Sequence, residues 1–270
     1  MVKKKNLIYQ YWLGTPGEAV KYGAENMKNY ADRIGAEYIF KTDPYWAQMY
    51  CDIPTYYNAF EPIWAERFEE YDNILFADTD VFSVDCLKES IFDQKIADIG
   101  ICREEHKEIT RGRGEGIFNN KTDKLWNSYL KTKYKVDMPL NDNGDMKIFN
   151  TGVVMYSPEG REKARKGFVP FQEYIDYMRG TSLPRFYQID QNYLHAMMFI
   201  ADMDITEMDH GWNTYIHYAG NSDVTPRPVY DGRDDREAKL CHVQLRNADN
   251  HNGPWHYTIV NKPQSEWDLP

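Results

Sequence analysis

The first forty residues contain two short apolar runs separated by a helical pattern. Residues 6–11 (NLIYQY) are mostly apolar and predict a buried strand. A turn-forming stretch, GTPG, follows. Apolar and small residues then recur at helical spacing over 18–34, and Gly35 stands where that helix should end. Residues 37–41 (EYIFK) predict a second strand, so the chain opens with a β-α-β unit.

The alternation of strands and helices continues through the next sixty residues. Residues 59–71 carry apolar side chains on one helical face and predict a helix. The run at 73–77 (NILFA) predicts a buried strand, a short helix follows near 86–92, and 98–102 (DIGIC) predicts another strand. This order predicts an α/β fold with a mainly parallel central sheet flanked by helices.

The second half of the chain is less regular. Residues 103–120 are charged and glycine-rich (RGRGEG), so we expect a mobile loop that either closes over a substrate or has no function. The run KIFNTGVVMY predicts a strand over 147–156, interrupted at its NTG triplet. Further helical patterns cover residues 122–133, 159–166, 170–178 and 190–200. From residue 209 onward we expect irregular structure.

No internal repeat and no linker interrupts the sequence. We therefore expect a single domain over residues 1–270. The β-α-β opening and the strands up to about residue 102 would form a nucleotide-binding half, and about 103–270 would form the other half.

Charge and composition narrow the class of protein. The 270 residues carry a net charge of −10, which disfavours bulk nucleic-acid binding because phosphate recognition needs a basic face. The four cysteines are scattered without a C-x-x-C pair, which is typical of a reducing compartment rather than of a zinc ribbon or disulfide scaffold. No long apolar segment predicts a leader or membrane helix, so we expect a cytoplasmic protein.

Two carboxylates directly follow the strand predicted at 73–77. Asp78 and Asp80 alternate in an extended segment, which puts both on the same side. Ligands of α/β sheets bind outside the carboxyl ends of strands, and this pair lies there. Hard oxygen ligands so placed suit Mg²⁺ or Mn²⁺ bridging the phosphates of a nucleotide. The alternative is that the two aspartates only end the strand.

Two further elements offer polar side chains. His242 follows an apolar pair, and its imidazole could complete a metal site with two carboxylates, although a structural histidine is the alternative. Asp190 and Gln191 open an apolar helix, where Asp has a capping explanation. As a functional pair, their side chains could contact a sugar and its anomeric carbon.

Five segments together, in this order, resemble the motifs of GT-A glycosyltransferases: FADTDVF, FNTGVVMY, IDQNYLH, GWNTY and CHVQL followed by NGPW. The order of the motifs is similar to that of family 8 enzymes such as glycogenin and the bacterial lipooligosaccharide galactosyltransferases. The resemblance covers nearly the whole chain. It implies a GT-A fold and a metal-dependent hexosyltransferase with a glycan or other hydroxyl acceptor. A UDP-sugar is the donor that the resemblance favours, and GDP- or dTDP-linked donors stay open.

The resemblance also implies roles for individual residues. Mn²⁺ or Mg²⁺ would be held by Asp78, Asp80 and His242. The donor would be contacted by Tyr9, Tyr11, Thr79, Asn150, Thr151, Gly152 and Gly253. Catalysis at the sugar would involve Asp190 and Gln191. The wall on the acceptor side would include Trp212 and Asn213.

The chain departs from the family pattern at three positions. Gly253 replaces a lysine that contacts the diphosphate, so Arg246, His251 or the glycine-rich loop would have to supply that charge. Glu61 lies where the family tends to place a basic residue, and Asn192 replaces the second acid of D-Q-D. Retention and inversion therefore both stay open: the leaving diphosphate could accept the acceptor's proton, or Asp190 could act as general base.

Three other functions compete with this interpretation. A haloacid dehalogenase phosphatase also has D-x-D after an apolar strand, but it also needs a lysine and a later acidic pair, and here only Asp234-Asp235 offers one. A nucleotidyltransferase would share the metal and the nucleotide, but no glycine-rich phosphate loop follows the first strand. The third is a noncatalytic protein that binds nucleotide sugars.

Overall fold

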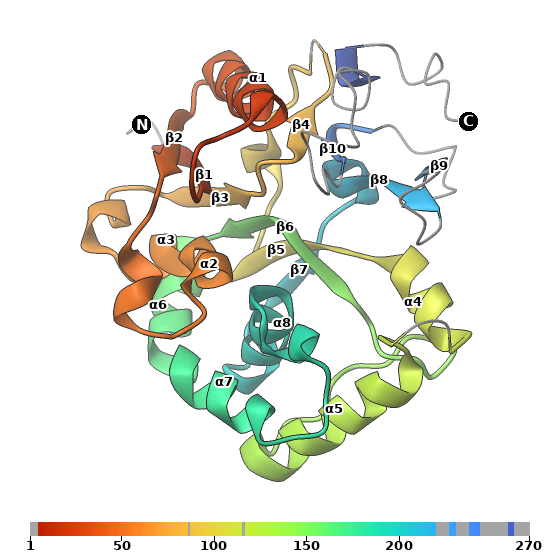
Figure 1. Cartoon of the computed structure of the whole chain (residues 1–270). Coiled ribbons are helices and arrows are strands. Elements are labelled where there is room, and N and C mark those ends of the chain that lie inside the picture. The colour runs from red at the N-terminus through yellow and green to blue at the C-terminus, as the bar shows by residue number, and fades with distance from the viewer. Residues whose placement is uncertain are drawn as a thin grey trace.

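A six-stranded sheet forms the centre of the computed structural model, which describes residues 5–85, 87–114, 117–219, 227–230, 238–243 and 259–261 (Figure 1). Its strands lie in the order β2-β1-β3-β6-β5-β7. Their bounds are β1 (Asn6–Trp12), β2 (Glu37–Thr42), β3 (Asn73–Ala77), β5 (Ile99–Arg103), β6 (Phe149–Tyr156) and β7 (Ile205–Glu207). All neighbours pair in parallel except β6, which is antiparallel to β3 and β5. The predicted α/β architecture with a mainly parallel sheet is confirmed.

Helices cover both faces of this sheet. Their bounds are α1 (Glu18–Ile34), α2 (Pro54–Tyr57), α3 (Glu61–Trp64), α4 (Glu105–Gly112), α5 (Asn120–Tyr134), α6 (Pro158–Gly167), α7 (Phe171–Arg179) and α8 (Asp190–Ile200). Figure 1 shows α1 on one side, and α2, α3, α6, α7 and α8 on the other. The predicted bounds of α1 and α8 match those observed, and α1 ends at Gly35 in the left-handed conformation (φ 71°). In the described part of the chain, no helix combines the length and apolar character needed to cross a bilayer.

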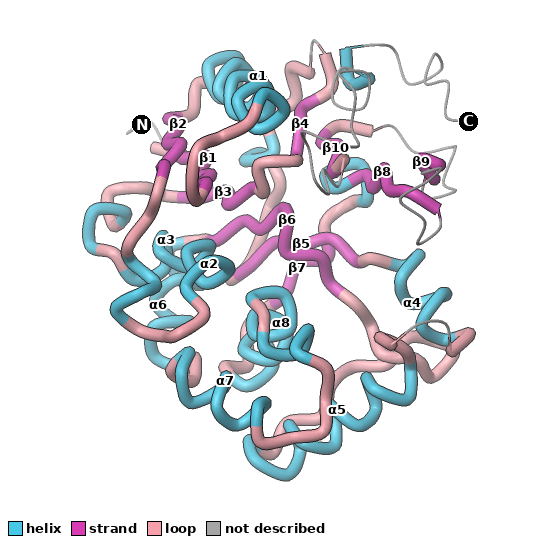
Figure 2. Tube along the Cα trace, viewed as in Figure 1, coloured by secondary structure: helices cyan, strands magenta, loops and turns pink. Residues whose placement is uncertain are grey.

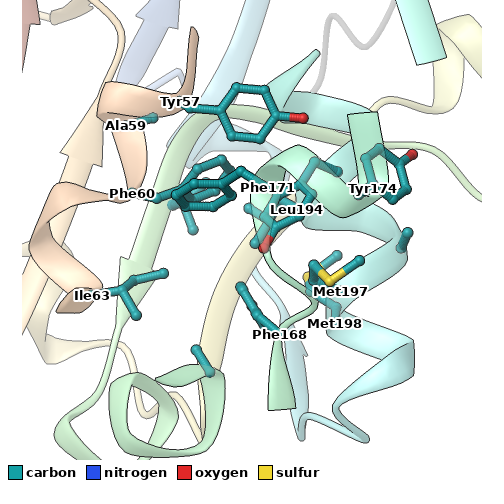
Figure 3. Packing of buried hydrophobic residues seen from close by; sticks show 14 of the residues in the cluster. Tyr57, Ala59, Phe60, Ile63, Phe168, Phe171, Tyr174, Leu194, Met197 and Met198 are labelled. Carbon is teal, nitrogen blue, oxygen red and sulfur yellow. The ribbon is translucent and has the colours of Figure 1, made fainter. Parts of the chain in front are cut away.

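Alternating side chains of the strands divide the core into two layers. In β3, Ile74 and Phe76 join the larger cluster beneath the sheet, whereas Leu75 and Ala77 join the cluster under α1. This follows from the two-residue repeat of a strand. Figure 3 shows the aromatic centre of the larger cluster, where the Phe171 ring lies 4.9 Å from Tyr57 and 5.6 Å from Phe60 between ring centroids.

The segment expected to form one helix over 59–71 is instead broken. A 3-10 turn, the four-residue helix α3 and another 3-10 turn follow one another there. Pro62 has no backbone donor and is confined to the first turn of α3. Ala65 then adopts an extended conformation (ψ 123°) that ends it. The apolar face is kept, because Phe60, Ile63 and Phe68 are still buried. Likewise, the short helix expected near 86–92 is a 3-10 turn over Ile91–Asp93.

The charged segment expected to be a mobile loop contains helix α4. Its inward residues are charged but paired. The Glu108 carboxylate accepts hydrogen bonds from the Arg103 guanidinium (2.7 and 3.1 Å) and from the Ile148 backbone (3.0 Å). Arg111 donates to Asp123 of α5 at 2.9 Å. These buried ion pairs fasten α4 to its neighbours, which is why a segment with little apolar content forms a helix.

A second sheet forms where irregular structure was expected. Its four strands lie in the order β4-β10-β8-β9 (Figure 2). Their bounds are β4 (Val81–Ser83), β8 (Thr214–Ala219), β9 (Arg227–Tyr230) and β10 (Leu240–His242). Strand β10 pairs antiparallel with β4, with His242 opposite Val81. This pairing brings His242 beside the two aspartates that precede β4.

Candidate functional site

The turn that carries Asp78 and Asp80 is held by three other parts of the fold. The Asp78 amide donates to the Gly152 carbonyl of β6 at 2.8 Å. The Asp78 carbonyl accepts from the Gln10 side chain of β1, also at 2.8 Å. The Asp80 carbonyl accepts from the Val243 amide after β10 at 2.9 Å. The backbone of the turn is therefore fixed before any ligand binds.

Asp78, Asp80 and His242 converge. The His242 Nε2 atom lies 3.2 Å from Asp80 Oδ1 and 3.8 Å from Asp78 Oδ2. One ligand atom from each residue lies within 4.8 Å of the others. Two carboxylate oxygens and an imidazole nitrogen are a suitable donor set for Mn²⁺ or Mg²⁺, with further positions left for phosphate oxygens or water. The three residues identified from the sequence therefore fit one divalent cation.

The two carboxylates lie close enough together that their electrostatic repulsion favours binding of a divalent cation. Partial burial and the neighbouring Asp80 carboxylate raise the pKa of Asp78 well above its ordinary value. Burial alone would lower the pKa of His242, but Asp80 and Asp78 outweigh it and raise that pKa above its ordinary value. Crowded carboxylates disfavour their own ionised forms, and a bound cation removes that penalty.

Asn150 orients His242 from behind. Its Oδ1 atom accepts from the Gly152 amide at 2.8 Å, which fixes the orientation of the side-chain amide. The same oxygen lies 3.2 Å from His242 Nδ1, and because this oxygen can only accept, Nδ1 must donate. Nε2 is then the ring nitrogen that shares its proton with Asp80 here, and that can give up this proton to offer its lone pair to a cation. Such an outer partner is what fixes the tautomer of a metal-binding histidine.

Gly152 provides the room for this ring. A Cβ atom added there would lie 2.2 Å from His242 Cε1 and 2.5 Å from Nδ1. Gly152 lies behind His242 and is not part of the described cavity lining, which changes its expected role from donor contact to support. We expect Gly152→Ala to displace the ring and lower Mn²⁺ affinity by about tenfold or more, measured by calorimetry.

Gly180→Ala is the matched control, because its added Cβ would lie 3.4 Å from the nearest atom at the end of α7. The melting temperature in EDTA shows whether each variant is folded. A folded Gly152→Ala protein with wild-type Mn²⁺ affinity would contradict the role given to Gly152.

A cavity of about 450 Å³ opens above the three ligands. Tyr11 and Tyr56 form part of one wall, and Asp190 and Gln191 belong to the lining as well. The predicted site residues on its surface are Tyr11, Asp78, Thr79, Asp80, Asn150, Thr151, Asp190, Gln191 and His242. No lysine or arginine lines it among the described residues. Among these lining residues, positive charge for an anionic ligand would have to come from a cation bound by the three ligands.

Asp190 and Gln191 begin helix α8. The Thr151 hydroxyl donates to Asp190 Oδ2 at 3.4 Å. Burial raises the pKa of Asp190 to about 6, against hydrogen bonds from backbone amides and Thr151 that favour the ionised form. The Gln191 Nε2 atom donates to the Phe149 carbonyl at 3.1 Å and to Glu104 Oε2 at 3.3 Å.

Tyr9 does not reach the cavity. Tyr9 and Tyr11 point to the same side of β1, but Tyr9 has no exposed surface and its hydroxyl donates to buried Glu61 at 2.9 Å. Tyr11 lies further towards the carboxyl end of the strand and lines the cavity. The expected donor contact of Tyr9 is thus corrected to a structural role.

The two residues expected on the acceptor side also lie in the interior. Trp212 is fully buried in the cluster under α1, and the Lys239 ammonium lies 4.8 Å from its ring centroid. Asn213 is buried and donates to Asn150 Oδ1 at 2.8 Å. Neither lines the described cavity, so Trp212 packs the core and Asn213 supports Asn150.

The basic side chains of α4, and Arg103 just before it, do not line the cavity, and Lys107 lies 3.6 Å from the Glu104 carboxylate. Arg103 is paired with Glu108, and Arg111 with Asp123. Gly253 and the two other candidates, Arg246 and His251, lie outside the described residues.

Sequence reasoning missed Tyr215 on the cavity wall and Glu104, which contacts the lining residue Gln191 from behind that wall. Glu104 follows β5 at the same sheet edge as Asp78, and that position after an apolar strand was a usable signal. Tyr215 lines the cavity, and its ring centroid lies 4.7 Å from that of His242. No sequence pattern marks this tyrosine.

Comparisons with known proteins agree with the fold. No family profile and no curated protein matches the chain. A solved glycosyltransferase involved in the glycosylation of the major capsid of PBCV-1 is 12% identical, covers 95% of this chain and 100% of its own, and gives a TM-score of 0.52. The galactosyltransferase LgtC with donor and acceptor sugar analogues is 14% identical over 94% of each chain, with a TM-score of 0.49. The first likeness supports the predicted GT-A fold.

Proposed function

We propose that this protein is a metal-dependent glycosyltransferase that moves a hexose from a nucleotide sugar, with UDP as the nucleotide, to a hydroxyl acceptor. The observation that carries the proposal is the convergence of Asp78, Asp80 and His242 at the carboxyl end of β3, beside a cavity of about 450 Å³. The GT-A fold and the family 8 motif order support the same assignment.

The three ligands would hold Mn²⁺ or Mg²⁺, which neutralises charge on the leaving diphosphate when bound. Tyr11 and Thr79 would contact the nucleotide, in the half of the chain up to about residue 102. Thr151 and Asp190 would contact the transferred sugar, because both line the cavity beside the metal ligands. The acceptor would approach from the half formed by residues 103–270.

A thermal-shift screen of nucleotide sugars tests this proposal. A ligand that binds only the native state raises the melting temperature by mass action. We expect UDP-hexoses to stabilise the protein with Mn²⁺, and not with EDTA or in Asp80→Ala. Release of UDP from the stabilising donor, measured with and without Mn²⁺, then separates an enzyme from a noncatalytic binding protein.

The phosphatase alternative predicts that nucleotide sugars do not raise the melting temperature. It needs a lysine beside the first aspartate, and among the described lining residues there is none. Absence of any nucleotide-sugar shift in folded, metal-loaded protein, together with hydrolysis of a phosphate monoester, would overturn the proposal. The anomeric configuration of the product, read by NMR, would decide between retention and inversion.

A further inference from the structure

Glu104 is a buried carboxylate behind the wall of the cavity. It directly follows β5, its backbone amide donates to the Ile148 carbonyl at 2.7 Å, and only 5% of its surface is exposed. It does not line the described cavity. Its Oε2 atom accepts from Gln191 Nε2 at 3.3 Å, and its carboxylate also forms a hydrogen bond with the Tyr215 hydroxyl.

The charges around this carboxylate favour its ionised form. Burial alone would raise the pKa of Glu104, but Lys107, Arg111 and His242 outweigh it and hold that pKa below its ordinary value. The Lys107 ammonium lies 3.6 Å from Glu104 Oε1. An ionised carboxylate can only accept hydrogen bonds, so it selects donors from the groups that face it.

Gln191 has a defined orientation as a result. Two acceptors, Glu104 Oε2 and the Phe149 carbonyl, converge on its Nε2 atom. A flipped side chain would place the amide oxygen against a carboxylate and a carbonyl, which is repulsive. The amide oxygen is thus the end that remains for the cavity, which Gln191 lines.

Two chains of hydrogen bonds start at Glu104. The first arm is its contact with Gln191, and the second arm leads through Tyr215 and Asn150 to the metal ligand His242. The Tyr215 hydroxyl accepts from Asn150 Nδ2 at 2.9 Å. Asn150 Oδ1 in turn lies 3.2 Å from His242 Nδ1. Glu104 therefore lies at the branch point between Gln191 and the histidine of the metal site.

We propose that Glu104 is a positioning residue that turns the carbonyl oxygen of Gln191 into the cavity and, through Tyr215, keeps Asn150 and His242 aligned. It acts on the reaction only through these neighbours. The inference rests on the proposed function, because Gln191 has a catalytic meaning only if a sugar is transferred.

Glu104→Gln tests the first arm, with Glu105→Gln at the start of α4 as the matched control. An amide at position 104 can face Gln191 with its own N–H and so permits the flipped orientation. We expect kcat for UDP release to fall by about tenfold to a hundredfold while KM for the donor changes by less than about threefold. Glu105→Gln should leave both values unchanged.

A double-mutant cycle shows whether Glu104 acts through Gln191. In the Gln191→Ala background, Glu104→Gln should change kcat by less than about twofold, because the group that it positions is gone. Two fully additive losses would overturn the proposal. Tyr215→Phe tests the second arm, and it should weaken Mn²⁺ binding without changing the orientation of Gln191.

A metal-free measurement separates this proposal from the proposed function. The side-chain amide resonance of Gln191, identified by its absence in Gln191→Leu, should shift in Glu104→Gln and stay in place in Glu105→Gln. An unmoved resonance in folded Glu104→Gln would overturn the positioning role, whether or not the wild type releases UDP. If Glu104→Gln does not fold, Glu104→Asp retracts the same carboxylate and should move the same resonance.

Discussion

Asp78→Asn should lower metal-dependent UDP release by about a thousandfold and remove the Mn²⁺-induced rise in melting temperature. The Asp78 carboxylate is one of only two anionic groups in the ligand set. Its amide replacement keeps the shape of the turn, because the backbone of Asp78 makes the contacts with Gly152 and Gln10. Calorimetry with Mn²⁺ and a coupled assay for UDP measure the two effects.

The same substitution should stabilise the protein in EDTA. Burial and the Asp80 carboxylate disfavour the charge on Asp78, which raises its pKa, and a neutral amide has no such penalty. Water screens part of this effect, because 41% of the Asp78 side chain is exposed. Asp137→Asn, on an exposed carboxylate paired with Lys131, is the control and should keep the Mn²⁺ response. Full Mn²⁺ stabilisation of Asp78→Asn would argue against this metal site.

The sequence predicted the elements whose apolar spacing is decisive. The helix over 18–34 and the strand over 73–77 were found at the expected bounds. The helix expected over 59–71 was wrong because burial of Phe60 and Phe68 requires only that both face inward, and a broken chain achieves that as well. Helix α4 was missed because its inward positions are charged, and periodicity records apolar faces only.

The candidate site divides in a similar way. Asp78, Asp80 and His242 were predicted from residue type and motif order, and the structure brings them together. The sequence could not show which of the predicted side chains line the cavity. Tyr9 and Tyr11 share one face of β1, and only the position of the sheet edge shows which of them meets the cavity.

The antiparallel direction of β6 also could not be predicted from the sequence. It places the first residues of β6 beside the carboxyl end of β3, with Val153 opposite Ala77. A parallel strand would have placed Asn150 at the far edge. The contact between Asn150 and His242 therefore depends on strand direction, which residue spacing alone does not reveal.

Asp190→Asn should separate catalysis from metal binding. Asp190 lines the cavity but lies outside the ligand set, so the variant should keep the Mn²⁺-induced rise in melting temperature. UDP release should fall by about a thousandfold, because an amide can neither accept a proton nor stabilise positive charge at the sugar. Thr151→Val, which removes only the hydroxyl bonded to Asp190, should cost about tenfold. Wild-type turnover of Asp190→Asn would refute its catalytic role.

The pH dependence of stability gives an independent measure of Asp190. Its pKa is about 6 in the folded protein against an ordinary 3.8, so the folded state holds this proton more tightly than the unfolded chain does. Protonated Asp190 therefore stabilises the fold fully below pH 3.8, the unfolded-state pKa. This stabilisation is lost as pH rises through the folded-state pKa of about 6. In EDTA, the stability of Asp190→Asn relative to wild type should therefore increase by about 2 kcal/mol between about pH 4 and about pH 7. A difference that stays constant over this range would mean that Asp190 titrates normally, and that the cavity does not disfavour its charge.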